Sequence, residues 1–394
     1  MKPKRRVITT PGGRSGKRTP TVRRIRSAIV PAPPKGPSGT SRPVPGSPTA
    51  AARTTGTQPP GALEPPVASG FDGEVDLQVD LAPGRGGLDL SNPLVGAAGA
   101  FGFGVELVDV LDIERIGAIV TRGVTLKPRA GNPGRRVVDV PAGLLNSIGL
   151  QGPGVDAVID RYAPTWARWS TPVIVNLAAG SAGDFAELAR RLDGVPGVAG
   201  LELDLACQPS RGGTRFALDP AAAGAVVTAV RRATSLPVVA KLSAEATDVR
   251  SVARSVVEAG ADAIAAINTV AGLAVAGDRS GPLLGTGYGG LSGPAIRPIA
   301  LRVVYEIAQV VEVPIVGSGG VTGIDDVLDL LAVGASAVAV GTAALADPML
   351  PVRLADELAD VCRRQGLSSH RPLVGSALPA RPAPPSARGV EYRP

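Results

Sequence analysis

The chain of 394 residues is poor in the residues that build several common kinds of site. It has two cysteines and one histidine, too few for a disulfide framework or a Cys/His zinc site. Because the single histidine, His370, lies near the C-terminus, a histidine-dependent catalytic triad is not expected. The two cysteines, Cys207 and Cys362, instead fit a reducing compartment or a reactive thiol.

Aromatic residues and long apolar runs are also scarce. Aromatics make up 3% of the chain, so we expect a core built from Val, Leu, Ile and Ala. No apolar run is long enough to span a bilayer, and no apolar segment of a signal peptide follows the basic N-terminus. We therefore expect a large cytoplasmic protein without a transmembrane segment.

The net charge of +7 is unevenly distributed. Residues 1–70 hold 13 Lys/Arg, one acidic residue and 14 of the 38 prolines, and the remainder holds 28 basic and 33 acidic residues. Because so polar a segment buries too little apolar surface to offset its ordering entropy, we predict a disordered basic tail over 1–70. The tail can bind nucleic acid or anionic membrane weakly by charge, but a solvated extension with no specific nucleic-acid partner is the simpler interpretation. Residues 371–394 resemble a second, Pro-rich tail.

Between the tails, over residues 75–366, short apolar runs alternate with helical patterns. The expected strands are 93–99, 118–124, 172–178, 200–207, 237–243, 263–269, 314–320 and 337–343, and the clearest expected helices are 182–192, 219–233, 248–260, 296–311 and 323–334. Eight strand–helix units predict a closed (β/α)8 TIM barrel, a fold that typically takes about 250 residues. A doubly wound open sheet is the alternative, although the glycine-rich stretch 96–104 lacks the setting of a nucleotide-binding fingerprint.

The active site of such a barrel lies at the carboxyl ends of its strands, and polar residues gather there in this sequence. They are Arg122, Asn176, Asp204, Cys207, Lys241, Asn268, Thr269, Ser318 and Thr342. The stretches "GSGGV" (317–321) and "GTAALADP" (341–348) follow the last two strands and offer small residues with accessible backbone N–H groups. This arrangement favours a phosphate site over a pair of merely tight turns.

Lys241 and Cys207 are the reactive side chains at this end of the predicted barrel. A buried lysine is costly unless it meets an anion, so Lys241 is expected to face a phosphate, a substrate carboxylate or a reduced flavin. Pairing with a loop acid such as Glu245 or Asp248 is the structural alternative. A thiolate at Cys207 can act as nucleophile or base, whereas a buried inert cysteine is the usual alternative. Cys362 lies in a predicted outer helix and is interpreted as structural.

An ordered set of segments between residues 75 and 350 resembles the class 1 dihydroorotate dehydrogenases, most closely the B subtype. The segments are "AAGAFGFG" (97–104), "TLKPRAGNPGRRV" (125–137), "GLLNSIGLQGPG" (143–154), "LELDLAC" (201–207), "AKLS" (240–243), "INT" (267–269), "GGLSGPAIRPIAL" (289–301), "GSGGV" and "AVAVGTA" (337–343). The resemblance implies FMN at the barrel mouth and oxidation of (S)-dihydroorotate to orotate in pyrimidine biosynthesis. It further implies a homodimer. The electron acceptor stays open among fumarate, quinone, oxygen and NAD, and the likeness to the B subtype favours NAD reached through an electron-transfer subunit that carries an iron–sulfur cluster and FAD.

The resemblance also implies roles for individual residues. Cys207 would be the base that removes the C5 proton as hydride passes from C6 to flavin N5, and Lys241 would stabilise the reduced flavin. The implied cofactor-binding residues are Ala98, Gly99, Arg122, Asn176, Asp204, Lys241, Ile267, Gly293, Gly319, Gly320, Gly341 and Thr342. The implied substrate-binding residues are Arg122, Asn146, Gly149, Leu150, Asn268 and Thr269.

The chain departs from the family pattern on the substrate side. Arg122 stands where Lys is usual, Gly152 where Asn is common, and 204–209 reads Asp-Leu-Ala-Cys-Gln-Pro where Asn-x-Ser-Cys-Pro-Asn is usual. The planar fork of Arg122 binds a carboxylate in a different geometry, and an ionised Asp204 accepts hydrogen bonds but donates none. Two alternatives follow: a divergent flavoprotein acting on another dihydropyrimidine-like heterocycle, and a non-catalytic flavin-binding protein.

Overall fold

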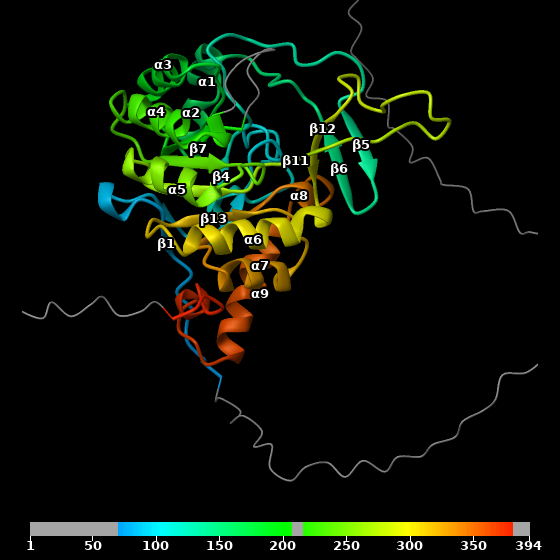
Figure 1. The fold of residues 1–394 in the computed structure, drawn as a ribbon. Helices are drawn as coiled ribbons and strands as arrows, with labels where there is room; N and C mark the ends of the chain where they lie inside the picture. Colours follow the sequence, from blue (N-terminus) through cyan, green and yellow to red (C-terminus); the bar gives the residue numbers. More distant parts are fainter. Residues whose placement is uncertain (1–69, 207–215, 381–394) are drawn as a thin grey trace, which may run out of the picture. The chain divides into compact units, whose positions relative to one another are not determined.

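Eight parallel strands close into a barrel at the centre of the structure (Figure 1). The computed structural model describes residues 70–206 and 216–380, all within one unit that spans Glu64–Pro394. The predicted basic tail up to residue 69 and the stretch that contains Cys207, Gln208 and Pro209 lie outside the described residues.

The strands pair around the ring in sequence order. They are β3 (Leu94–Gly96), β4 (Ala118–Val120), β7 (Val173–Leu177), β8 (Gly200–Asp204), β9 (Val238–Leu242), β10 (Ala263–Ala266), β13 (Ile315–Ser318) and β14 (Ala337–Val340). Pairing of β14 with β3 closes the ring, with Val338 opposite Leu94. The predicted (β/α)8 barrel is therefore confirmed, and the open sheet is excluded.

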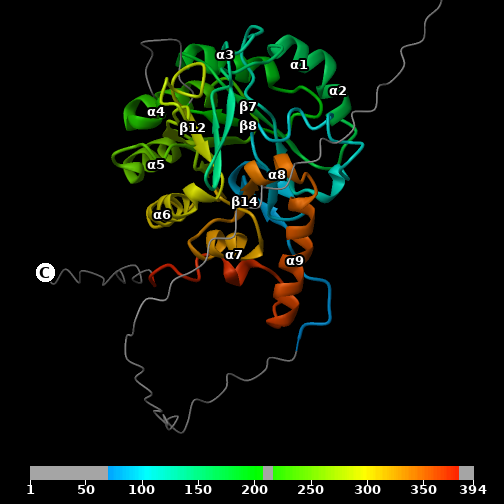
Figure 2. The same ribbon diagram turned by 90° about the vertical axis from the view of Figure 1, so that its right-hand side faces the viewer.

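The helices cover the outside of the barrel (Figure 2). They are α1 (Val155–Arg161), α2 (Ala163–Trp166), α3 (Ala182–Leu192), α4 (Pro220–Arg231), α5 (Val249–Glu258), α6 (Arg297–Ala308), α7 (Ile324–Ala332), α8 (Thr342–Ala346) and α9 (Leu350–Arg364). Short 3-10 helices are η1 (Pro83–Arg85), η2 (Ile113–Arg115), η3 (Phe216–Leu218), η4 (Pro294–Ile296) and η5 (Arg371–Leu373). The five predicted helices correspond to α3–α7, and α4–α7 end two or three residues before their predicted ends.

Helix α3 illustrates why these segments form helices. The hydroxyl of Ser181 accepts a hydrogen bond from the backbone N–H of Asp184 at 3.1 Å and so caps the first turn. Phe185, Leu188 and Leu192 recur at helical spacing, and all three are fully buried against the barrel. The local cap and the apolar stripe thus specify the same helix.

Small and β-branched side chains fill the inside of the barrel. This inner core contains Val95, Ala118, Val120, Ile174, Val239, Ala263, Ala265, Val316, Ala337 and Ala339. A hairpin of β1 (Val79–Asp80) and β2 (Asp89–Leu90) closes the amino-terminal end with apolar side chains such as Leu81 and Leu88. Because the apolar filling ends at the carboxyl ends of the strands, the polar side chains found there need partners or a ligand.

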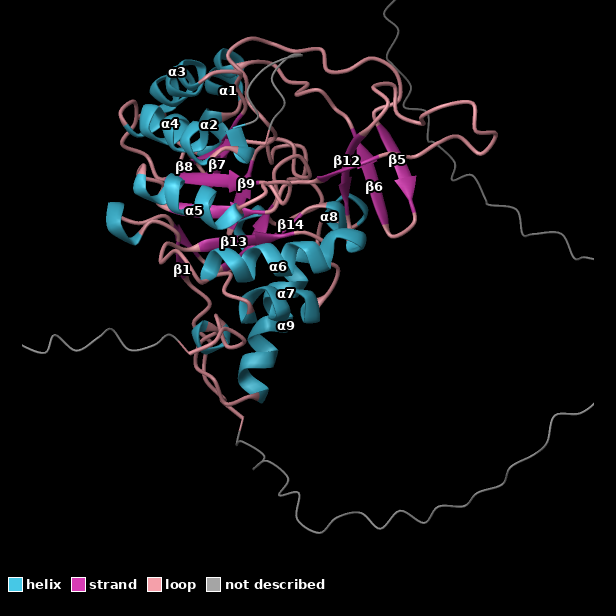
Figure 3. Cartoon of the chain, in the orientation of Figure 1, coloured by secondary structure: helices cyan, strands magenta, loops and turns pink. Residues whose placement is uncertain are grey.

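A second, antiparallel sheet was not expected from the sequence. It has the order β11 (Val270–Gly272), β12 (Gly289–Ser292), β6 (Gly143–Asn146) and β5 (Val137–Val140). All four strands lie in connections that leave the carboxyl ends of β4 and β10, and they stand beside the barrel mouth (Figure 3). Stretches such as "GGLS" lack apolar alternation, so pairing across 140 residues of chain, rather than local pattern, forms this sheet.

The C-terminal boundary also differs from the prediction. Residues 371–380 do not form a detached tail: η5 lies there, and Leu373, Val374 and Leu378 pack against the core. The backbone N–H of Gly375 donates to the carbonyl of Leu331 at 2.9 Å, which anchors the segment on α7. The apolar side chains of this segment thus hold it on the core despite its Pro-rich composition. Residues 381–394 lie outside the described residues.

Candidate active site

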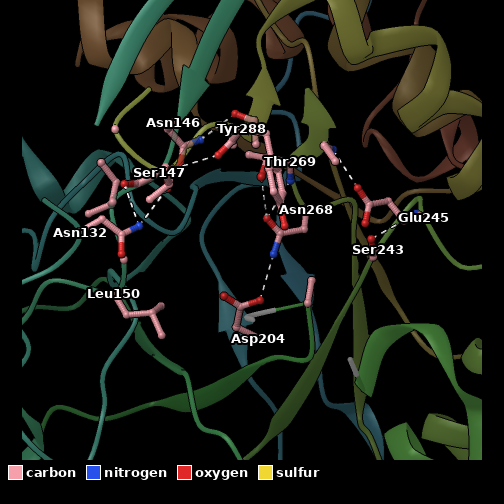
Figure 4. Close-up of a pocket in the computed structure, with 18 of the residues that line it drawn as sticks. Asn132, Asn146, Ser147, Leu150, Asp204, Ser243, Glu245, Asn268, Thr269 and Tyr288 are labelled. Atoms are coloured by element: carbon pink, nitrogen blue, oxygen red, sulfur yellow. Dashed lines mark hydrogen bonds between the residues drawn. The ribbon is translucent and has the colours of Figure 1, made fainter. Parts of the chain in front are cut away.

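A cavity of about 760 Å³ opens at the carboxyl ends of β8, β9 and β10, next to the antiparallel sheet (Figure 4). It is lined by Arg129, Asn132, Asn146, Ser147, Ile148, Gly149, Leu150, Asp204, Ala206, Ser243, Glu245, Asn268, Thr269, Ala271, Gly285, Thr286, Tyr288, Gly289 and Gly290. Five of the six predicted substrate-binding residues are among them. The exception is Arg122, which follows the end of β4. Its backbone N–H donates to the carbonyl of Gly102.

One wall of the cavity is a hydrogen-bonded pair, Asn268 and Asp204. The Nδ2 group of Asn268 donates to Oδ1 of Asp204 at 2.9 Å, and the two side chains face each other in Figure 4. The other end of the amide, Oδ1, accepts from the backbone N–H of Thr269 at 2.7 Å. Both ends of Asn268 are therefore fixed, and a carboxylate stands at the cavity wall.

The opposite wall comes from the antiparallel sheet and its loops, and sequence reasoning missed most of it. Nδ2 of Asn132 donates to the hydroxyl of Ser147 at 2.9 Å, and the Thr286 hydroxyl donates to the same oxygen at 2.8 Å. Nδ2 of Asn146 donates to the carbonyl of Gly290 at 3.1 Å, across the β6–β12 pair. Asn132 and Ser147 lie inside segments that carried the family resemblance, but no local pattern placed them at the cavity.

Three polar side chains from adjacent strands lie together at the barrel mouth. Nδ2 of Asn176, on β7, donates to Oε1 of Glu202, on β8, at 2.6 Å. Nζ of Lys241, on β9, lies 3.4 Å from the same oxygen, with side-chain exposures of 11% for Lys241 and 5% for Glu202. The anion that pairs with Lys241 is therefore Glu202.

The loop acids proposed as partners of Lys241 have other roles. Glu245 accepts a hydrogen bond from the backbone N–H of Ala271 at 2.8 Å, and Asp248 caps α5 through the backbone N–H of Ser251. The expectation that Lys241 pairs with one of these loop acids is therefore wrong, because its ion-pair partner is Glu202 on β8. The alternation of Leu201, Glu202, Leu203 and Asp204 was a signal for Glu202, because it placed both acids on the inward face of the strand.

The glycine-rich turns after β13 and β14 lie beside each other at the mouth. The hydroxyl of Thr342 donates to that of Ser292 at 2.8 Å, and a Cβ added to Gly293 would lie 3.6 Å from the methyl group of Thr342. Gly320 has a φ of +80°, and a Cβ there would lie within 3.0 Å of the backbone of Arg297. At Gly341 an added Cβ would meet only Cβ of Ala97, at 3.5 Å, so this turn has room at its surface.

The remaining predicted residues are placed as follows. Ala98 and Gly99 follow β3, and Ile267 follows β10 and is 4% exposed. Cys207 lies outside the described residues, although its neighbour Ala206 lines the cavity. Of the predicted cofactor-binding residues, only Asp204 lines the same cavity.

Cys362 lies far from this chemistry, on α9, and is fully buried. Burial raises the pKa of its thiol, which disfavours the reactive thiolate. This environment is that of a structural cysteine.

The part of the chain that the structure describes contains neither a candidate metal site nor a candidate membrane-spanning helix. Across 70–206 and 216–380, no group of three or more His, Cys, Asp or Glu side chains could hold a metal ion. None of the helices in these ranges is both long and apolar enough to cross a membrane.

The chain was also compared with known proteins. The family model described as dihydroorotate dehydrogenase matches residues 81–362. A protein of Desulforudis audaxviator named dihydroorotate dehydrogenase B (NAD(+)), catalytic subunit, is 45% identical over 302 residues, which cover 76% of this chain and 98% of that protein. A protein of Pelobacter propionicus with the same name is 46% identical, with the same coverage.

Among solved structures, the dihydroorotate dehydrogenase of Eimeria tenella in complex with ferulenol superposes with a TM-score of 0.65. The match covers 78% of this chain and 89% of that one at 20% identity. At this identity, the likeness supports the barrel fold alone.

Proposed function

The chain belongs to the dihydroorotate dehydrogenase family, and we propose that it is the catalytic subunit of a B-type enzyme that oxidises (S)-dihydroorotate to orotate in pyrimidine biosynthesis. The observation that carries this proposal is the cavity at the barrel mouth, where Asn146, Gly149, Leu150, Asn268 and Thr269 converge from two separate segments. Their amide and hydroxyl groups suit a flat heterocycle with alternating donors and acceptors.

The proposed cofactor is FMN, and the residues at the mouth fit it. The turns at Gly319-Gly320 and Gly341-Thr342 offer backbone N–H groups for a phosphate, and Gly341 has space beside it. Lys241 and Asn176 supply an ammonium and an amide for the polar edge of a flavin ring. We assign the other contacts to Ala98, Gly99, Arg122, Asp204, Ile267 and Gly293, as the family resemblance implies.

The chain's own side chains would bind the substrate and move one proton. Asn146, Asn268 and Thr269 hold the ring, and Arg129, which lines the cavity, or Arg122 meets the substrate carboxylate. Cys207 takes the proton from C5 as a general base. Bound FMN supplies the acceptor for the hydride that leaves C6.

Electrons would then leave through a second protein. The relatives are named as catalytic subunits of NAD(+)-linked enzymes, which supports a partner subunit. As the family resemblance implies, we propose that this partner carries FAD and an iron–sulfur cluster. We also propose a homodimer located in the cytoplasm. Gel filtration of the co-expressed subunits and NADH formation by the complex would test this arrangement.

A second candidate function is oxidation of another dihydropyrimidine-like heterocycle. The hydrogen bond from Asn268 to Asp204 favours it, because a carboxylate at this wall attracts ring N–H donors and repels an anionic substrate. A neutral substrate would avoid that repulsion.

An anaerobic visible spectrum of the purified protein tests both functions. A flavin band that bleaches on addition of dihydroorotate supports the main proposal. A flavin band that stays oxidised with dihydroorotate but bleaches with a neutral dihydropyrimidine supports the second. A protein that binds no flavin contradicts both.

A further inference from the structure

Glu202 is a buried acid at the barrel mouth to which the proposed reaction assigns no role. It lies on β8 between Leu201 and Leu203, which point outward and are fully buried. Glu202 therefore points into the barrel, where it is 4% exposed. A carboxylate in this position is strongly destabilising unless a positive group and hydrogen bonds compensate for its lost hydration.

Those partners come from the two neighbouring strands. Nδ2 of Asn176 donates to Oε1 of Glu202 at 2.6 Å, and Nζ of Lys241 lies 3.4 Å from that same oxygen. Asn176 is the register partner of Glu202 across the β7–β8 pair, so its donor is fixed by the sheet itself. The carboxylate is thus held from one side and meets the ammonium on the other.

Three acids lie on the elements around Lys241, and Glu202 forms an ion pair with it in the structure. On β8 its register partner is Asp204, whose carboxylate is hydrogen-bonded to Asn268. On β10 it faces Ala265, and the acid of the following loop, Glu245, accepts from the backbone N–H of Ala271. Glu202 forms the ion pair with Lys241, at 3.4 Å.

We propose that Glu202 is a positioning residue for Lys241, whose ammonium group it fixes at the flavin side of the mouth. The inference rests on the proposed FMN site. Its physical basis is geometric: the β7–β8 register holds Asn176 against the carboxylate of Glu202, and that carboxylate meets Nζ of Lys241 at 3.4 Å. An ammonium held in this place would stabilise the negative charge that the cofactor gains on reduction.

The test is the midpoint potential of bound FMN at one pH, measured for the wild type and for Glu202→Gln. If Glu202 fixes the ammonium of Lys241 beside the flavin, loss of that position should lower the potential, whereas removal of a buried negative charge alone would raise it. Glu306→Gln is the control, since it removes an acid that pairs with Arg302 on α6, and it should keep the wild-type potential. An unchanged or raised potential in Glu202→Gln overturns the inference.

Glu202→Gln can also fail to fold, because it leaves a buried ammonium without its partner. The double variant Glu202→Gln/Lys241→Met then decides, since it removes both charges. If the double variant folds and the single variant does not, the coupling of the two residues is supported; if both fail, Glu202 has a purely structural role. A wild type that binds no FMN would overturn the proposed cofactor and this inference together, whereas an unchanged or raised potential in Glu202→Gln overturns the inference alone.

Discussion

At the scale of single residues, Asp204 places a carboxylate at the wall of the cavity. Its carboxylate lines the cavity and accepts from Asn268 at 2.9 Å, so it stands close to any bound ring. Asp204→Asn keeps an acceptor for Asn268 but removes the negative charge. If dihydroorotate is the substrate, its KM should fall by about tenfold with little change in kcat, because repulsion of the substrate carboxylate is relieved.

The matched control is Asp184→Asn, which removes an exposed carboxylate from the first turn of α3. Steady-state kinetics with both variants separate a local charge effect from a change in net charge. A rise in KM for Asp204→Asn would mean instead that the carboxylate contributes to the binding of dihydroorotate, which would contradict the predicted repulsion.

The two cysteines should behave in opposite ways. Cys207→Ala should lower kcat by a factor of about 10² to 10⁴, the usual contribution of a general base. Cys362→Ala should leave turnover unchanged, because Cys362 is buried on α9 and burial raises the pKa of its thiol. Single-turnover bleaching of the flavin measures this step directly, and normal bleaching in Cys207→Ala would remove the proposed base.

At the scale of elements, a substitution in the turn between β14 and α8 should weaken the binding of the cofactor without lowering the stability of the fold. A Cβ on Gly341 would meet only Ala97, at 3.5 Å, so Gly341→Ala should fold normally. If a phosphate lies against this turn, the methyl group should raise the Kd for FMN at least tenfold. Gly323 lies at the start of α7, where an added Cβ would meet no atom within 4 Å. Gly323→Ala should therefore leave both the Kd for FMN and the thermal stability unchanged. Fluorescence titration with FMN and thermal melts of the apoproteins measure the two effects.

At the scale of the whole molecule, the two ends of the described chain are joined at His370. Asp76 and Ser369 form a parallel bridge, and the His370 ring, 2% exposed, lies against the carbonyl of Asp76 at 3.4 Å. Burial lowers the pKa of His370; its backbone hydrogen bond and the charges of Asp76 and Arg371 have smaller effects.

Stability should therefore depend on pH through this residue. The unfolded chain binds a proton at His370 more readily than the folded chain, so the free energy of unfolding should fall as the pH drops below about 6.5. His370→Gln, which cannot titrate, should flatten this dependence between pH 7.5 and 5.5. Urea denaturation at several pH values measures it, and equal slopes for both proteins would contradict the assignment.

The basic N-terminal segment should be dispensable for the chemistry. The family match begins at residue 81, and every residue placed in the candidate site lies beyond residue 90. Deletion of residues 1–69 should leave the flavin spectrum and kcat/KM unchanged within about twofold, the range of ordinary surface changes. A loss of turnover would show that the segment acts in the reaction or in docking of a partner.

The strand and helix periods sufficed to predict the barrel, because each element carries its own signal. Leu201, Leu203 and their neighbours alternate, and Phe185, Leu188 and Leu192 recur at helical spacing. The ends of the parallel strands must then meet at one mouth, so Asn176, Lys241 and Asn268 could be assigned to a site before any contact was known.

The antiparallel sheet and the partners within the site could not be predicted in this way. The pairing of β6 with β12 joins segments about 140 residues apart, and no local pattern in "GLLN" or "GGLS" specifies it. Likewise, the sequence showed that Lys241 needs an anion and suggested a loop acid, Glu245 or Asp248, whereas the tertiary structure places Glu202 beside it. The amino-acid sequence by itself determined the barrel, its mouth and the residue types found there. Only the tertiary structure decided which of these side chains touch, because strand register and long-range pairing set distances of a few ångströms that local periodicity does not contain.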